Sequence, residues 1–231
     1  MFGIDPLYVM IMLPALILAG LATLLTKLTF GKYSKQRASS GLTGAQAAQR
    51  LLTMQGVHDV TIEQVQGFLS DHYDPRSKTL RLSPAVYASP SLSAIGVACH
   101  EAGHALQHAT RYAPLALRSA LVPVAQFGSY GSYIFIMLGT FTSVMGLITI
   151  GILLFSATVL FSLITLPVEW NASIRAKQMM VSAGIVTPSE QRASSAVLNA
   201  AFLTYIAAAL TALLQLLYHL MRAGVLGGRR N

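Results

Sequence analysis

The apolar positions of this chain gather in long uncharged runs that flank one polar block. The first run, Pro6 to Thr26, is rich in Leu, Ile, Ala and Met. Residues 119–168 contain no charged side chain, and a last uncharged run extends from Ala193 to Tyr218. A helix needs about 20 apolar residues to cross a bilayer. The pattern therefore predicts one span, a hairpin of two spans that turns near residues 139–143, and a fourth span.

The polar block, residues 38–114, predicts a small folded insert that contains both strands and helices. Alternating apolar and polar positions indicate strands at 60–65 and 78–82, on either side of turn-forming residues at 71–77. We expect these two strands to pair as an antiparallel hairpin. The predicted fold class is therefore a mainly α, multipass membrane protein with about four transmembrane helices and a small α+β insert.

Two helices are expected within the polar block. Thr43 is a suitable N-cap for the first, over residues 44–54. Ser89 followed by Pro90 indicates the start of the second, which runs to about residue 110 and which Pro114 stops. The expected organisation is a first span, a soluble insert, a transmembrane hairpin, a connecting helix, and a last span with its tail: residues 1–30, 31–118, 119–168, 169–192 and 193–231.

Composition and charge agree with a membrane protein. The chain is 54% hydrophobic and 10% charged, whereas an ordinary globular domain carries about 25% charged residues. The net charge is +8, but the basic residues lie beside the apolar runs and are not interleaved with aromatic residues. The bilayer is therefore the expected partner, and nucleic acid is not. Cys99 is the single cysteine, which excludes an internal disulfide.

The distribution of Lys and Arg predicts the orientation in the membrane. Thirteen of the sixteen fall on the side that holds the polar block, and cytoplasmic flanks are rich in such residues. The polar block is therefore expected in the cytoplasm. The other three, Arg222, Arg229 and Arg230, fall on the far side if the fourth run crosses the bilayer. We favour that crossing; a re-entrant last segment is the alternative.

An HExxH motif lies in the second helix of the polar block, at His100, Glu101 and His104. Histidines four residues apart share one helical face, so both imidazoles can bind one Zn²⁺, and the intervening glutamate can reach a water on that metal. A chance match or a buried structural pair is the alternative. The flanking residues are uncharged, and burying two histidines and a carboxylate there is costly without a metal.

Glu169 is the predicted third ligand. It is one of only eight acidic residues, and it ends the uncharged hairpin at the expected membrane surface. Pro167 is expected to start a helix there, and small residues after Glu169 would let it approach the HExxH helix: Ala172, Ser173 and Ala176. The alternative is an interfacial carboxylate neutralised by Arg175. His108 lies about 12 Å along the helix from His100, so contact with a ligand or with another helix is expected for it instead.

Three segments resemble the YugP-like membrane zinc metallopeptidases of bacteria: DHYDPRSKTLRLSPAVY at 71–87, AIGVACHEAGHALQHA at 94–109 and LPVEWNAS at 166–173. The resemblance implies a zincin-like insert, with a site similar in logic to that of the HtpX-like gluzincins, in a bacterial inner (plasma) membrane. It implies that His100 and His104 bind zinc, that Glu101 is the catalytic base, and that the segment around Glu169 supplies the carboxylate. The family typically has Asp where this chain has Asn171.

The expected function is hydrolysis of peptide bonds in membrane or membrane-associated proteins by a zinc-dependent endopeptidase at the cytoplasmic face. Tyr87, Tyr112 and Arg175 are candidates for stabilising the oxyanion, and one of the predicted strands would pair with an extended substrate. The alternative is a non-catalytic zinc-binding membrane scaffold or regulator, which the Asn171 departure favours. A small transporter is disfavoured because the spans lack paired charges. The sequence indicates no oligomeric state.

Overall fold

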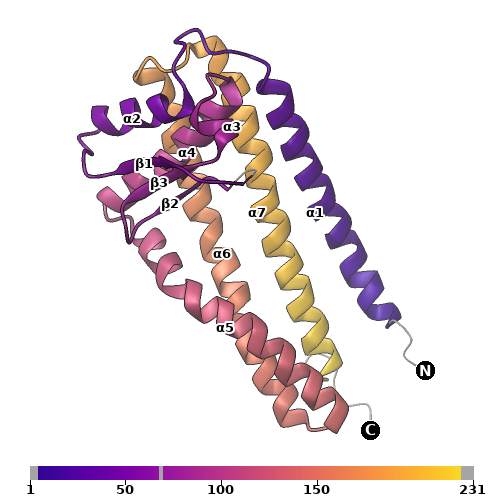
Figure 1. Ribbon diagram of the computed structural model, residues 1–231. Coiled ribbons are helices and arrows are strands. Elements are labelled where there is room, and N and C mark those ends of the chain that lie inside the picture. The colour runs from indigo at the N-terminus through magenta and orange to yellow at the C-terminus, as the bar shows by residue number, and fades with distance from the viewer. Residues whose placement is uncertain (1–4, 68–69, 225–231) are drawn as a thin grey trace. The chain divides into compact units, whose positions relative to one another are not determined.

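The computed structural model describes residues 5–67 and 70–224, and helices dominate it (Figure 1). Within these ranges, four helices are long and apolar enough to cross a membrane: α1 (Pro6–Tyr33), α5 (Ala113–Thr142), α6 (Met145–Ser182) and α7 (Pro188–Arg222). Their outward apolar side chains, such as Leu153 at 67% exposure, suit contact with lipid. The predicted fold class, a multipass α protein with a small α+β part, is confirmed.

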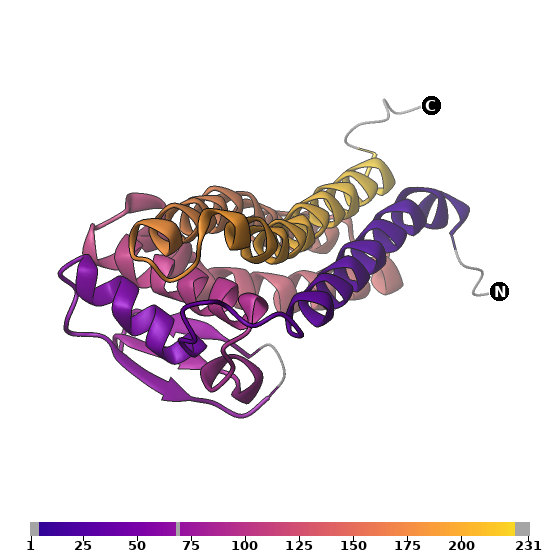
Figure 2. The ribbon, with the colours of Figure 1, turned by 90° about the horizontal axis from the view of Figure 1, so that it is seen from above.

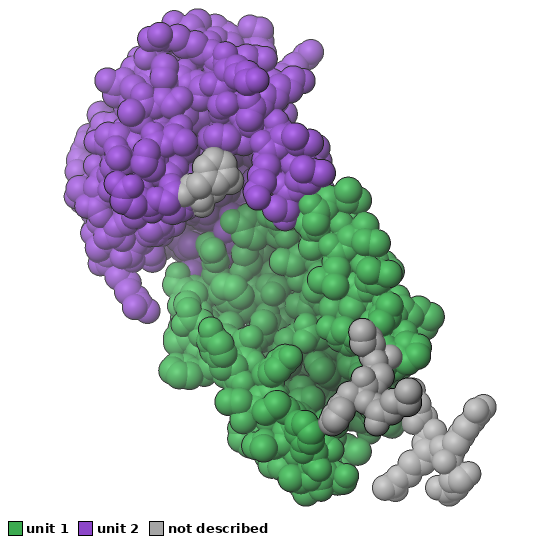
Figure 3. All heavy atoms as spheres, turned by 45° about the vertical axis from the view of Figure 1, so that its right-hand side comes forward, with its two compact units in different colours: residues 1–22, 117–167, 204–231 green, residues 23–116, 168–203 purple. Residues whose placement is uncertain are grey.

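The chain forms two compact units, each built from segments that are distant in sequence (Figure 3). Unit 1 comprises Met1–Ala22, Leu117–Pro167 and Thr204–Asn231. Unit 2 comprises Thr23–Ala116 and Val168–Leu203. Unit 2 thus contains the whole polar block together with the segment that follows the transmembrane hairpin.

The sheet of unit 2 has three strands, β1 (Thr61–Gln64), β2 (His72–Asp74) and β3 (Thr79–Leu82), in the order β1-β3-β2. The expected antiparallel pairing of the first and last strands is wrong, because β1 and β3 are parallel. The hairpin joins β2 to β3, since Asp74 accepts hydrogen bonds from Arg76 N–H and Ser77 Oγ–H and closes the turn directly before β3. Because β2 lies between β1 and β3 in the sequence, the chain reverses its direction twice, and β1 and β3 therefore run in the same direction.

The first predicted helix is confirmed as α2 (Gly44–Met54), which Thr43 and Gln46 begin with a reciprocal capping box. A short helix that the pattern did not predict, α3 (Pro84–Tyr87), follows β3. The second predicted helix, α4 (Leu92–Ala109), begins two residues later than expected. Its N-cap is Ser91, whose side chain accepts from Ala94 N–H. Figure 2 shows the same ribbon from above.

A backbone contact explains the later start of α4. The Pro90 carbonyl accepts a hydrogen bond from Ala38 N–H, and Arg37 and Ser91 form an isolated antiparallel bridge. Residues around Pro90 are therefore extended, and the helix can begin only after them. At its other end, Thr110 N–H bonds to Leu106 O, and Arg111 turns with a φ of 52°. Pro114 consequently lies in the first turn of α5, where proline is tolerated, and does not itself stop α4.

Pro167 lies inside α6, so the expectation that a new helix starts after it is wrong. Proline removes one backbone donor and crowds the preceding turn, but α6 continues through it, as membrane helices tolerate. The result places Glu169 on the same continuous helix as the apolar residues of the third span.

Near the start of α1 and the end of α7, unit 1 contains a polar contact. Tyr218 OH donates to Asp5 Oδ2 at 2.9 Å, and Arg222 Nε lies 3.5 Å from the same oxygen. Helix α7 is one continuous helix of 35 residues, which is long enough to cross a bilayer. Arg229 and Arg230 lie outside the described residues.

Candidate metal centre

Helix α4 is the central helix of unit 2, and nearly all of it is buried. It contacts α2, α3, β2 and β3. Ile95, Ala98 and Ala102 are fully buried in the same apolar cluster as Leu51, Leu52, Leu80 and Leu82. Cys99 is buried there too, and burial raises the pKa of its thiol, so packing is its role in this structure. The packed apolar side of α4 holds the histidine-bearing side in place.

The histidine-bearing helix and α6 approach each other closely within unit 2. A Cβ added at Gly103 would lie 2.7 Å from the Ala172 carbonyl oxygen, which is closer than real contacts allow. Ala172 and Ala176 are fully buried and Ser173 is 3% exposed. The expectation that small residues after Glu169 permit a close approach is confirmed. On α4, position 103 requires glycine for the same close approach, because any other residue would add a Cβ.

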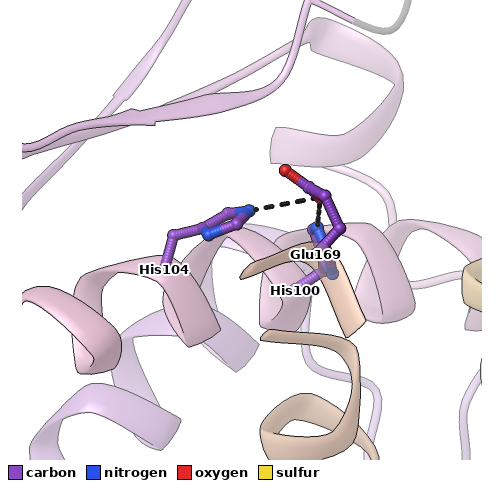
Figure 4. A group of neighbouring side chains, drawn as sticks. All are labelled: His100, His104 and Glu169. Atoms are coloured by element: carbon purple, nitrogen blue, oxygen red, sulfur yellow. Dashed lines mark hydrogen bonds and ion pairs between the residues drawn. The ribbon is translucent and has the colours of Figure 1, made fainter. Parts of the chain in front are cut away.

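Three potential ligands converge at this contact (Figure 4). Their ligand atoms, from His100, His104 and Glu169, all lie within 4.8 Å of one another. Glu169 Oε2 is 3.1 Å from His100 Nε2 and 3.5 Å from His104 Nε2. Zinc bonds of about 2.0–2.2 Å place neighbouring ligands of a tetrahedron about 3.4 Å apart. The donor set and its spacing therefore fit a zinc ion with three protein ligands.

Glu101 lies on α4 directly after His100 and is 9% exposed. It is not among the three side chains that converge in the described part of the chain. His108 is likewise outside the group: its Nδ1 shares a hydrogen bond of 2.9 Å with Tyr73 OH on β2. Burial, followed by the nearby Asp59 and Asp74, raises the pKa of Tyr73 to about 12.

The Nδ1 atoms of the two histidines make further polar contacts. Ser173 Oγ and His100 Nδ1 are 3.1 Å apart, and Gln107 Oε1 lies 3.0 Å from His104 Nδ1. Gln107 in turn donates to Asn171 Oδ1, which also accepts from Arg175 Nε. Asn171 and Arg175 thus lie two and three contacts away from His104.

The other candidates lie on segments that flank α4. Tyr87, at the end of α3, packs against the apolar cluster, and Tyr112 follows α4 and is half-buried. Asp71, one of the turn-forming residues predicted at 71–77, has a structural role: it accepts hydrogen bonds from the Ser83 backbone N–H and hydroxyl. Burial raises the pKa of this carboxyl, and its contacts stabilise the start of α3.

Sequence reasoning missed Gln107 and Ser173 as partners of the histidines. A signal existed for both. Gln107 is an uncharged polar residue three positions after His104 on an apolar helix, so it shares the face of that ligand. Ser173 lies four residues after Glu169, so it shares the face of that carboxylate on its own helix. Their polar atoms needed partners once the helix faces were buried, and the ligand histidines supply them.

Comparison with known proteins identifies the family of the chain. A family model described as "Putative neutral zinc metallopeptidase" matches residues 8–224. The chain is 48% identical over 215 residues to the "Putative membrane protease YugP" of Bacillus subtilis (strain 168), covering 93% of this chain and 96% of that relative. No solved structure matches the chain. The family resemblance predicted from the three sequence segments is confirmed.

Proposed function

We propose that this chain, which belongs to the family described as "Putative neutral zinc metallopeptidase", is a zinc-dependent endopeptidase of the bacterial plasma membrane. The observation that carries the proposal is the convergence of His100, His104 and Glu169 from two helices, with Glu101 next to His100 in the sequence of α4. Hydrolysis at a metal requires a base next to the ion, and a carboxylate can act as that base. A purely structural zinc site would need a fourth ligand instead.

The roles of the residues follow from this arrangement. His100, His104 and Glu169 would hold the ion. When bound, zinc polarises a substrate carbonyl and lowers the pKa of a water molecule to about 7. Glu101 accepts the proton of the attacking water and then delivers it to the departing amine. Tyr87, Tyr112 and Arg175 remain the candidates for stabilising the oxyanion that forms between these steps.

The non-catalytic alternative was favoured by Asn171, where the family typically has Asp. Here Asn171 acts through Oδ1, which accepts from both Gln107 Nε2 and Arg175 Nε. Asparagine supplies that oxygen as well as aspartate does, so the hydrogen bonds survive the substitution. This supports the enzyme over the scaffold.

The structure offers β2 for binding an extended substrate. This strand pairs with β3 on one side and is at the edge of the sheet in the described part of the chain. It also contacts α4, through Tyr73 and His108 among others. A peptide added to this edge would run along the helix that carries the site. The apolar helices that belong to the same chain favour membrane proteins or their unfolded segments as substrates.

Chelation is the direct test of zinc dependence. The purified protein is expected to cleave unfolded casein, to lose nearly all of that activity when a zinc chelator removes the ion, and to recover it when Zn²⁺ is restored. Peptide release is the measurement, with the metal content determined on the same samples. Hydrolysis that persists in metal-free protein would contradict zinc catalysis, and fully zinc-loaded protein without hydrolysis of any unfolded substrate would favour the scaffold.

A cytoplasmic site predicts which positions an impermeant maleimide can reach in intact cells. Ser40→Cys, in the exposed loop before α2, is expected to react only after the membrane is permeabilised. Thr142→Cys, exposed at the end of α5, is expected to react without permeabilisation. The native Cys99 is buried and serves as an unreactive background. The opposite labelling pattern would place the site outside the cell.

A further inference from the structure

One buried side chain joins the metal centre to the segment of α6 behind it. Gln107 is fully buried, and both ends of its amide are engaged. Its Nε2 donates to the Val168 carbonyl oxygen at 2.8 Å and to Asn171 Oδ1 at 3.0 Å. Its Oε1 lies 3.0 Å from His104 Nδ1. The question is whether the amide of Gln107 truly faces His104 with its oxygen, because an oxygen there requires the hydrogen on Nδ1.

The direction of each hydrogen bond can be deduced by starting at Arg175, because its guanidinium only donates. Arg175 Nε donates to Asn171 at 2.8 Å, so the atom of Asn171 that faces it must be the oxygen. That oxygen also faces Gln107, which must therefore present its amide nitrogen. The Val168 carbonyl, another group that only accepts, imposes the same orientation on Gln107.

With its nitrogen on that side, Gln107 must present its oxygen to His104. An oxygen without hydrogens can only accept, so His104 Nδ1 must carry the proton. In the neutral ring, which is the form that binds a metal, the other nitrogen, Nε2, then keeps its lone pair. Nε2 is the atom that lies 3.5 Å from Glu169 Oε2, on the side where the three ligands converge.

We propose that Arg175, Asn171 and Gln107 form a directional relay of hydrogen bonds that holds His104 as the Nδ1–H tautomer and presents Nε2 to the metal. The relay rests on the proposed function, and within it Gln107 is a positioning residue. The two histidines differ in this respect. The partner of His100 Nδ1 is Ser173 Oγ, a hydroxyl that can donate or accept and therefore does not select a tautomer.

Substitution of Gln107 tests the relay through zinc affinity. Gln107→Leu keeps the apolar volume but removes the acceptor, and it is expected to weaken zinc binding by about 10–100-fold in competition with a chromogenic chelator. Gln49→Leu, the same change at an exposed position of α2, is the matched control and is expected to bind zinc as the unchanged protein does. A folded Gln107→Leu protein with the affinity of the control would overturn the proposal.

A second pair of variants asks whether the oxygen of Asn171 is what matters. Asn171→Asp retains an acceptor for both Gln107 and Arg175, whereas Asn171→Leu removes it. The Asp variant is expected to bind zinc more tightly than the Leu variant by severalfold. Equal affinities would show that the side chain at position 171 does not help to orient His104. Asn199→Leu, at an exposed asparagine of α7 that bonds to Lys177, controls for the loss of an amide.

The tautomer itself can be observed in metal-free protein. In ¹⁵N spectra of histidine-labelled protein, with the His104 signals assigned by their loss in His104→Gln, the proton is expected on Nδ1 in the unchanged sequence. Gln107→Leu is expected to shift the signals toward the other tautomer. An Nδ1 without a proton in the unchanged protein would overturn the relay. Neither this spectrum nor the chelator assay requires hydrolysis, so failure of the proposed peptidase activity and failure of the relay are distinguishable.

Discussion

Glu101→Gln is expected to lower peptide hydrolysis by about 10²–10⁴-fold while the protein keeps its zinc. The amide has nearly the same size as the carboxylate but cannot accept a proton from water. Because Glu101 lies outside the group of converging ligands, its replacement leaves His100, His104 and Glu169 in place. The measurement is casein cleavage by the two proteins at equal concentration, with zinc content determined on both.

The matched control for this change is Glu63→Gln. Glu63 is exposed on β1, where it pairs with Arg81, so the same loss of charge occurs away from the site. Its activity is expected to equal that of the unchanged protein. If Glu101→Gln also hydrolyses casein at the full rate with zinc bound, Glu101 is not the base and the peptidase mechanism is refuted.

Glu169→Ala is expected to reduce zinc affinity by more than about 100-fold, because removing only an outer partner of a ligand already costs about 10–100-fold. The carboxylate is 1% exposed and lies within 3.5 Å of both ligand histidines, and water cannot easily replace it in the packed contact. The measurement is the metal content of purified protein after equilibration with buffered zinc.

Loss of zinc from Glu169→Ala could also arise from disturbed packing, so a second variant is needed. Glu169→Gln preserves the volume and one oxygen but removes the charge, and it is expected to bind zinc more weakly than the unchanged protein and more tightly than the Ala variant. Full zinc occupancy in a folded Glu169→Ala protein would remove Glu169 from the set of ligands. Glu63→Ala is the control for the loss of an acidic side chain.

The candidate ligands were predictable because charges are scarce in this chain. With eight acidic residues in 231, the single carboxylate at the end of an uncharged hairpin had few competitors for the third position. The spacing of His100 and His104 placed both on one helical face regardless of where α4 began. The span count followed from the length of uncharged runs, which depends little on tertiary structure.

Other features depended on contacts that a local pattern does not contain. Alternation of apolar residues indicates a strand but not its direction, so the parallel pairing of β1 and β3 was not predictable from either segment. The later start of α4 depends on Ala38, more than fifty residues away. The role of Gln107 required knowledge that Val168 and Asn171 lie beside it, on a helix separated from it by the transmembrane hairpin.

The order of the ligands along the chain has a consequence for biosynthesis. His104 and Glu169 are 65 residues apart in sequence, and the whole uncharged hairpin of residues 119–168 lies between them. At about 5–20 residues per second, the ribosome needs roughly 3–13 s to pass from one ligand to the other. A newly made chain therefore lacks a complete metal site until the hairpin has been synthesised. Under the proposed function, hydrolysis is thus delayed until the segments that would anchor the protein in the membrane have been made.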